Sequence, residues 1–65
     1  MSKKYIQSKI YLLRNFCILA KNDPREQVVK KVLAAKQNEI QVDNFLHDIL
    51  AGRKTLDQAL QGVSL

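Results

Sequence analysis

The sequence predicts an all-α protein, a compact bundle of three to four short antiparallel helices. Apolar residues recur at helical spacing along the chain and nowhere alternate with polar residues for long enough to indicate a strand. Cap and stop signals divide the chain into segments of helix length, joined by turns of a few residues. Such short connections make consecutive helices antiparallel neighbours. A chain of 65 residues has room for one domain, which we expect to span residues 1–65.

The first helix is expected over residues 3–21. Projected at about 100° per residue, its apolar residues form an arc of roughly half the circumference. This is broader than the roughly 100° stripe that a helix needs against one neighbour. Because Cys17 lies inside the arc, we expect its side chain to pack in the core. The arc comprises Tyr5, Ile6, Ile10, Leu12, Leu13, Phe16, Cys17, Leu19 and Ala20.

The second helix is expected over residues 24–37. Its start is indicated by Asp23 as N-cap, Pro24 at the first helical position and Glu26 reaching back to complete a capping box. Asn38 is interpreted as a left-handed stop. The side chains expected to face inward are Val28, Val29, Val32, Leu33 and Ala35.

The third and fourth helices are expected over residues 41–51 and 56–62. Gly52 ends the third, whose buried face comprises Val42, Phe45, Leu46, Ile49 and Leu50. Thr55 and Gln58 have the spacing of a capping box at the start of the fourth. Gly62 closes that helix, and its inward side chains are Leu56, Ala59, Leu60 and Val63.

The small size of the chain limits its stability. A domain of this length buries only about 60% of its unfolded surface, and such domains usually add disulfides, a metal or a partner chain. One cysteine forms no internal disulfide, and structural zinc commonly needs four ligands. The sequence holds one His, one Cys and scattered carboxylates. We therefore expect no metal and no cofactor, and a contribution to stability from tight packing, from association with another chain, or from both.

Cysteine usage and hydropathy bear on location. A single thiol suits a reducing cytoplasm. Lys9 and Arg14 interrupt the apolar run near the N-terminus, so neither a signal peptide nor a membrane span is expected. The basic flank of the first helix is also typical of membrane-surface helices, but its apolar arc is needed to cover the other helices. We expect a soluble cytoplasmic protein with no membrane partner.

Catalytic chemistry has few candidate groups. A nucleophile needs an adjacent base, and the only imidazole, His47, is expected on the polar side of the third helix. Cys17 is expected in the core, away from it. The two glycines stand alone, which does not fit a phosphate-binding loop. We expect no enzyme activity, no catalytic residues and no small-molecule substrate.

A binding surface is predicted on the far side of the first helix. Tyr11 and Ile18, seven residues apart, share a narrow stripe there, and we expect them to contact a protein partner with Lys4, Arg14 and Lys21 at the rim. The sequence therefore predicts a small regulatory or adaptor protein that self-associates through its first helix. Solvent exposure without a partner is the alternative, because isolated exposed apolar residues are ordinary.

The alternative function is nucleic-acid binding. The net charge is +5, and residues 1–21 carry five basic and no acidic side chains. Base reading by the third helix is not expected, because it carries Asp43 and Asp48 without Lys or Arg. In the first helix, Lys3, Arg14 and Lys21 project to one side, where they would contact phosphates.

Overall fold

The computed structural model describes residues 2–63 and confirms the all-α prediction. Its helices are α1 (Lys3–Asn15), α2 (Arg25–Ala34), α3 (Glu39–Leu50) and α4 (Leu56–Gln61), and residues 2–63 contain no strand. Residues 1 and 64–65 of the expected domain lie outside the described range. No helix within that range is long and apolar enough to cross a bilayer.

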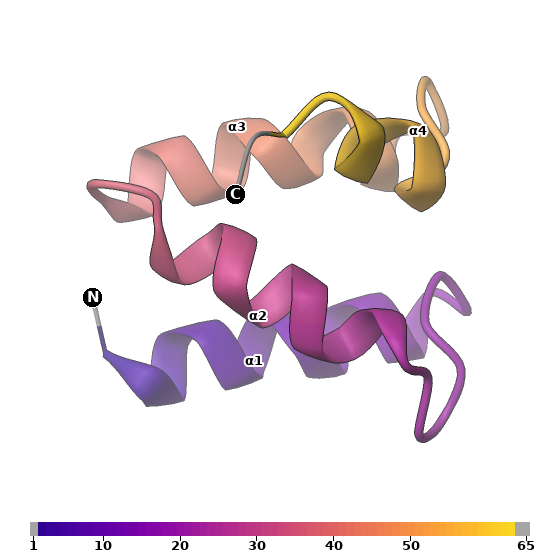
Figure 1. Ribbon diagram of the computed structural model, residues 1–65, viewed down its shortest axis with the longest axis horizontal. Helices are drawn as coiled ribbons and strands as arrows, with labels where there is room; N and C mark the ends of the chain where they lie inside the picture. The colour runs from indigo at the N-terminus through magenta and orange to yellow at the C-terminus, as the bar shows by residue number, and fades with distance from the viewer. Residues whose placement is uncertain (1, 64–65) are drawn as a thin grey trace.

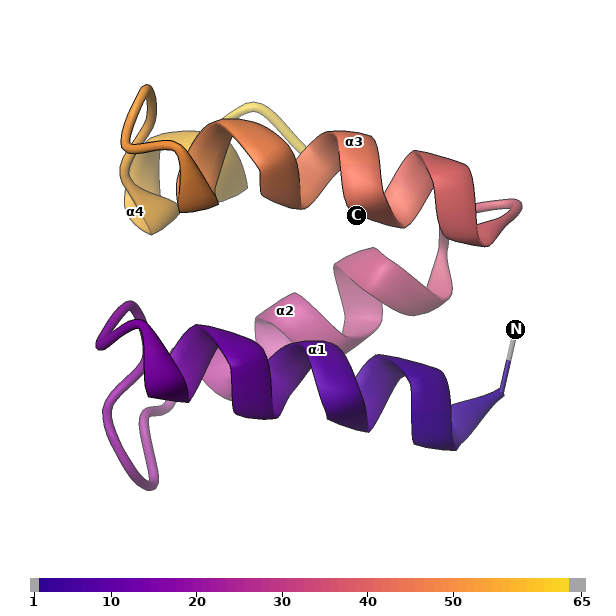
Figure 2. The same cartoon turned by 180° about the vertical axis from the view of Figure 1, so that it is seen from behind.

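The first three helices pass back and forth (Figure 1). α1 and α2 are antiparallel, as are α2 and α3, so α1 and α3 run in the same direction. α2 lies in front of the space between α1 and α3 in Figure 1 and behind it in Figure 2, so it packs across this pair. The short α4 folds back beside the C-terminal end of α3.

One hydrophobic core holds the four helices together. Full burial of an aliphatic side chain contributes about 1.5–3 kcal/mol, so this cluster is the main source of stability. Most of the inward positions expected for the second and third helices are confirmed, but Val28 is 37% exposed and Ala35, which follows the end of α2, is exposed, so these two predictions are wrong. Phe45 and Leu50 are partly buried against the core. The core comprises Ile10, Leu13, Leu19, Val29, Leu33, Val42, Leu46, Ile49, Leu56 and Ala59.

α1 ends at Asn15, and the prediction that it continues to residue 21 is wrong. Cys17 adopts a left-handed conformation with φ 60°, which helical residues do not have. Its amide donates to the Arg14 carbonyl at 3.0 Å, and the Ile18 amide donates to the Leu13 carbonyl at 2.9 Å. These two bonds form a Schellman motif, which satisfies the last carbonyls of the helix. The chain then turns back and places Leu19 in the core.

The early end of α1 changes the surroundings of Cys17 and Phe16. Cys17 is exposed, so the prediction that it packs in the core is wrong. Phe16, the C-cap of α1, is 59% exposed. The apolar arc assumed a continuous helix. The Phe16 amide still donates to the Leu12 carbonyl at 3.1 Å, and the residues after Phe16 do not follow the helical spacing.

α2 begins one residue later than expected. Pro24 precedes the helix with φ −61° and ψ −24°, and Asp23 accepts a hydrogen bond from the Arg25 amide at 2.9 Å. Asp23 therefore stabilises the helix start from the residue before the N-cap, which is Pro24 and not Asp23 as predicted. Glu26 does not complete a capping box, because its carboxylate binds Arg14 instead. α2 ends at Ala34 rather than at residue 37.

α3 begins at Glu39, two residues earlier than expected, and each of α3 and α4 ends one residue earlier than expected. These boundaries follow from their caps. Asn38 is extended, with φ −155°, and its side chain accepts from the Gln41 amide, so it is the N-cap of α3 rather than a left-handed stop for α2. Gly52, with φ +80°, ends α3 as predicted. The capping box of Thr55 and Gln58 is confirmed at the start of α4, which ends at Gln61.

Candidate interaction surfaces on α1

The stripe predicted from Tyr11 and Ile18 is not formed. Tyr11 lies on α1 and is 53% exposed. Ile18 lies beyond the end of α1 and is partly buried against the core. The two side chains therefore do not share a helix face, and their role in partner binding stays a prediction.

The basic residues predicted at the rim are also separated. Lys4 is exposed in the first turn of α1, and Lys21 is exposed in the connection to α2. Arg14 is partly buried, and its guanidinium lies 5.4 Å from the centroid of the Tyr11 ring. Because Lys21 is not helical, the expected alignment of Lys3, Arg14 and Lys21 on one helix side is wrong.

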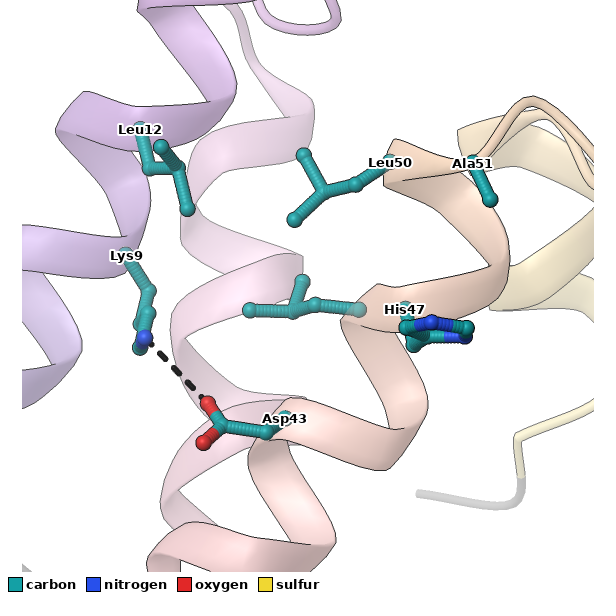
Figure 3. A pocket seen from close by; sticks show the side chains of 7 residues that line it. Lys9, Leu12, Asp43, His47, Leu50 and Ala51 are labelled. Carbon is teal, nitrogen blue, oxygen red and sulfur yellow. Dashed lines mark ion pairs between the residues drawn. The ribbon is translucent and has the colours of Figure 1, made fainter.

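A groove opens between α1 and α3 (Figure 3), which we call the α1–α3 groove. Its volume is about 430 Å³. It exists because α1 and α3 run side by side and α2 covers only their far side (Figure 2). It is lined by Lys9, Leu12, Asp43, Leu46, His47, Leu50 and Ala51.

One end of the α1–α3 groove is polar and fixed. Lys9 Nζ lies 3.2 Å from Asp43 Oδ1, and the Tyr5 hydroxyl donates to the same oxygen at 2.8 Å. The hydrogen bonds from Tyr5 and Lys9 lower the pKa of Asp43. Partial burial opposes the charge of Lys9, but the hydrogen bond to Asp43 and its charge outweigh this and raise the pKa of Lys9. Both groups are therefore charged at neutral pH.

The other end of the α1–α3 groove is apolar. Leu12 and Leu50 project from the two helices toward the groove, and both are partly exposed. Phe16 follows Leu12 by four residues, and therefore continues the same side of α1. Tyr5, Lys9, Leu12 and Phe16 thus form one stripe at spacings of four, three and four residues. Three of them stood in the predicted arc, but the sequence did not show that α3 lies alongside.

His47 is exposed at the edge of the α1–α3 groove, as predicted. Its Nδ1 lies 2.6 Å from Arg53 Nη2, and it accepts this bond because a guanidinium only donates. Arg53 also pairs with Asp48 at 2.7 Å. Cys17 does not line this groove, and nowhere in residues 2–63 do three His, Cys, Asp or Glu side chains gather where they could hold a metal ion.

A second, smaller depression lies between α1 and α2, and we call it the α1–α2 hollow. Its volume is about 280 Å³, and it is lined by Lys3, Ile6, Gln7, Lys30 and Ala34. Its walls come from the first two turns of α1 and the last two turns of α2. No sequence motif marks it, because it depends on how the two helices are aligned.

Comparison of the chain with protein-family models, with curated proteins and with solved structures found no match.

Proposed function

We propose that the protein is a small non-enzymatic interaction module that self-associates through the α1–α3 groove. The observation that supports this proposal is Phe16, an exposed aromatic residue one helical turn after Leu12, which lines the apolar end of that groove. Aromatic residues are enriched among the anchors of protein interfaces. A cytoplasmic location is part of the proposal, because an exposed thiol such as Cys17 stays reduced there.

A second copy of the chain is the partner that best fits this arrangement. In a twofold dimer the same patch serves both subunits. Because Phe16 and the groove are neighbours on one surface, a twofold axis beside them would seat each Phe16 against Leu12 and Leu50 of the other copy. Burial of a large apolar side chain contributes about 1.5–3 kcal/mol. The fixed pair of Lys9 and Asp43 would set the orientation of the two copies.

The experiment compares two exposed aromatic residues of the same helix. Sedimentation equilibrium over a range of protein concentrations measures the dimer dissociation constant of the wild type, of Phe16→Ser and of Tyr11→Ser. We expect Phe16→Ser to weaken the dimer at least tenfold, since the buried ring contributes more than about 1.4 kcal/mol. Tyr11→Ser is the matched control and should leave the dimer unchanged.

Two results would contradict this proposal. A monomer at every concentration would exclude self-association. Weakening by Tyr11→Ser alone would move the interface to the surface first predicted from the sequence.

Nucleic-acid binding is a second candidate, favoured by the distribution of charge. Five of the eleven cations form ion pairs, whereas six lysines have none among residues 2–63. Titration with random-sequence DNA at two salt concentrations tests this function, because each phosphate contact steepens the salt dependence. Absence of binding at low salt would remove it. The six lysines are Lys3, Lys4, Lys21, Lys31, Lys36 and Lys54.

A further inference from the structure

The antiparallel packing of α1 on α2 brings two sets of polar residues together. Lys3, Gln7 and Arg14 lie on one side of α1, at positions separated by four and seven residues. Arg14 meets Glu26 near the start of α2, and Lys3 and Gln7 line the α1–α2 hollow together with Lys30 and Ala34 from its last two turns. One end of this contact is therefore an ion pair, and the other end is the α1–α2 hollow.

The charges along this contact are not balanced. Its carboxylate, Glu26, accepts two bonds from Arg14 Nη2, at 2.6 and 2.7 Å. Lys30 Nζ reaches the same carboxylate only at 3.6 Å. Lys3 has no ion pair within the described chain, and no acidic residue lines the hollow. Two ammonium groups therefore flank the hollow: Lys30 shares the Glu26 carboxylate with Arg14, and Lys3 has no ion pair among residues 2–63.

The floor of the hollow is apolar. Ile6 is partly buried against the core, and Ala34 presents a methyl group from the last turn of α2. The aliphatic stems of Lys3 and Lys30 extend this surface. Lys3 is exposed, and the Lys30 ammonium lies 3.6 Å from Glu26. The Gln7 amide adds a hydrogen-bonding group that carries no charge.

We propose that the α1–α2 hollow binds an acidic segment of a partner protein that carries an apolar side chain beside its carboxylates. The carboxylates pair with Lys3 and Lys30, and the apolar side chain covers Ile6 and Ala34. The phosphates of a nucleic acid would pair with the two lysines but would leave the apolar floor exposed to water. The hollow therefore favours a peptide over a nucleic acid. The hollow is separate from the α1–α3 groove and is independent of self-association.

The first test uses a fluorescently labelled synthetic helix of leucine and glutamate, with binding measured by anisotropy. The expected result is saturable binding that is lost when glutamine replaces every glutamate of the peptide. The double variant Lys3→Gln and Lys30→Gln should weaken binding about tenfold. The matched control is Lys21→Gln with Lys54→Gln, which removes two exposed lysines elsewhere and should change binding less than twofold.

A second pair of variants keeps the net charge equal. Gln7→Glu places a carboxylate in the hollow, whereas Ser8→Glu places one on the next residue of α1, which does not line it. Both change the net charge from +5 to +4, so long-range attraction falls equally. We expect only Gln7→Glu to weaken peptide binding strongly. Circular dichroism checks that each variant retains the wild-type helix content.

Three results would overturn the proposal. The first is equal weakening by both lysine pairs, or by both glutamate variants, which indicates attraction by overall charge. The second is no binding of the leucine–glutamate peptide at low salt. The third is binding of a thymidine oligonucleotide, but not of the peptide, with the same dependence on Lys3 and Lys30.

Discussion

Arg14 of α1 and Glu26 of α2 form a double hydrogen bond, in which Nη2 donates to both carboxylate oxygens at 2.6 and 2.7 Å. Glu26 is the one buried charged residue among residues 2–63, with 8% of its surface exposed. Arg14 Nε is also buried and has no hydrogen-bond partner. Because burial of an unpaired charge is costly, each group depends on the other.

This pair makes stability depend on pH. The hydrogen bond from Arg14 lowers the pKa of Glu26 below its ordinary value of 4.5, and the charges of Arg14 and Lys30 act in the same direction. A carboxyl whose pKa is depressed by folding contributes fully above its unfolded pKa, and the contribution is lost as the pH falls through the folded pKa. We therefore expect the free energy of unfolding to fall as the pH drops below about 4.5. Urea unfolding at a series of pH values measures this.

The source of the acid sensitivity is tested with Glu26→Gln. This variant should be less stable than the wild type at neutral pH and should lose less stability on acidification. Asp48→Asn is the control. Arg53, the partner of Asp48, is more exposed than Arg14, so loss of the Asp48–Arg53 ion pair should destabilise the protein less. An unchanged pH profile in Glu26→Gln would contradict the assignment.

Gly52 should be the glycine that tolerates substitution least. Its φ of +80° is unfavourable for any residue with a Cβ, although no atom lies within 4 Å of the position a Cβ would take. Gly52→Ala should therefore destabilise the fold by about 1 kcal/mol through backbone strain alone. Gly62, with φ −81°, is the matched control, and Gly62→Ala should be neutral or slightly stabilising. Urea unfolding measures the free energy of unfolding of both variants, and equal destabilisation by the two substitutions would contradict the prediction.

Cys17 occupies the position at the end of α1 that Gly52 occupies at the end of α3. In both turns the left-handed residue donates to a carbonyl three residues back, and the next residue donates to one five residues back. Cys17→Gly should therefore stabilise the protein by about 0.5–1 kcal/mol, because relief of strain exceeds the added flexibility of the unfolded chain. Asn22→Gly, at φ 61°, should gain less, since asparagine tolerates this conformation. Thermal melts rank the two, and destabilisation by Cys17→Gly would refute the prediction.

Leu33 is expected to be critical for folding. It is fully buried on α2, where truncation to alanine leaves a cavity and costs about 2–5 kcal/mol. A protein of this length has a total stability of about 3–10 kcal/mol, so Leu33→Ala should unfold a substantial fraction of molecules. Val28→Ala, on the exposed side of the same helix, should cost less than about 1 kcal/mol. Urea unfolding followed by circular dichroism measures the stability of both variants. A small loss of stability in Leu33→Ala would contradict the central place of Leu33 in the core.

The parts of the fold that the sequence predicted depend on local chemistry. The Thr55–Gln58 box, the stop at Gly52 and the inward residues of α2 and α3 follow from spacing and from the conformational freedom of glycine. The end of α1 was missed because its left-handed position is held by Cys17, a residue that gives no stop signal. Asn38 was assigned to the wrong helix, because asparagine serves both as a stop and as an N-cap.

The candidate sites could not be predicted in the same way. The α1–α3 groove joins residues such as Lys9 and Asp43, which are distant in sequence and meet only once the helices pack. The spacing of Tyr5, Leu12 and Phe16 was visible as part of an apolar arc, but nothing in it indicated a parallel neighbour. The bond between Arg14 and Glu26 was not predicted either, because it also forms only once the helices pack. In addition, Glu26 fitted a capping box.

The back-and-forth path of α1, α2 and α3 also bears on how fast the protein folds. α1 packs closely on α2 and α3 on α4, so much of the search for native contacts takes place between segments separated by a short turn. Proteins dominated by such local contacts fold within microseconds to milliseconds. The newly made chain should therefore bury its apolar surface quickly. The exposed Phe16 should then contact other molecules almost only after the protein has folded.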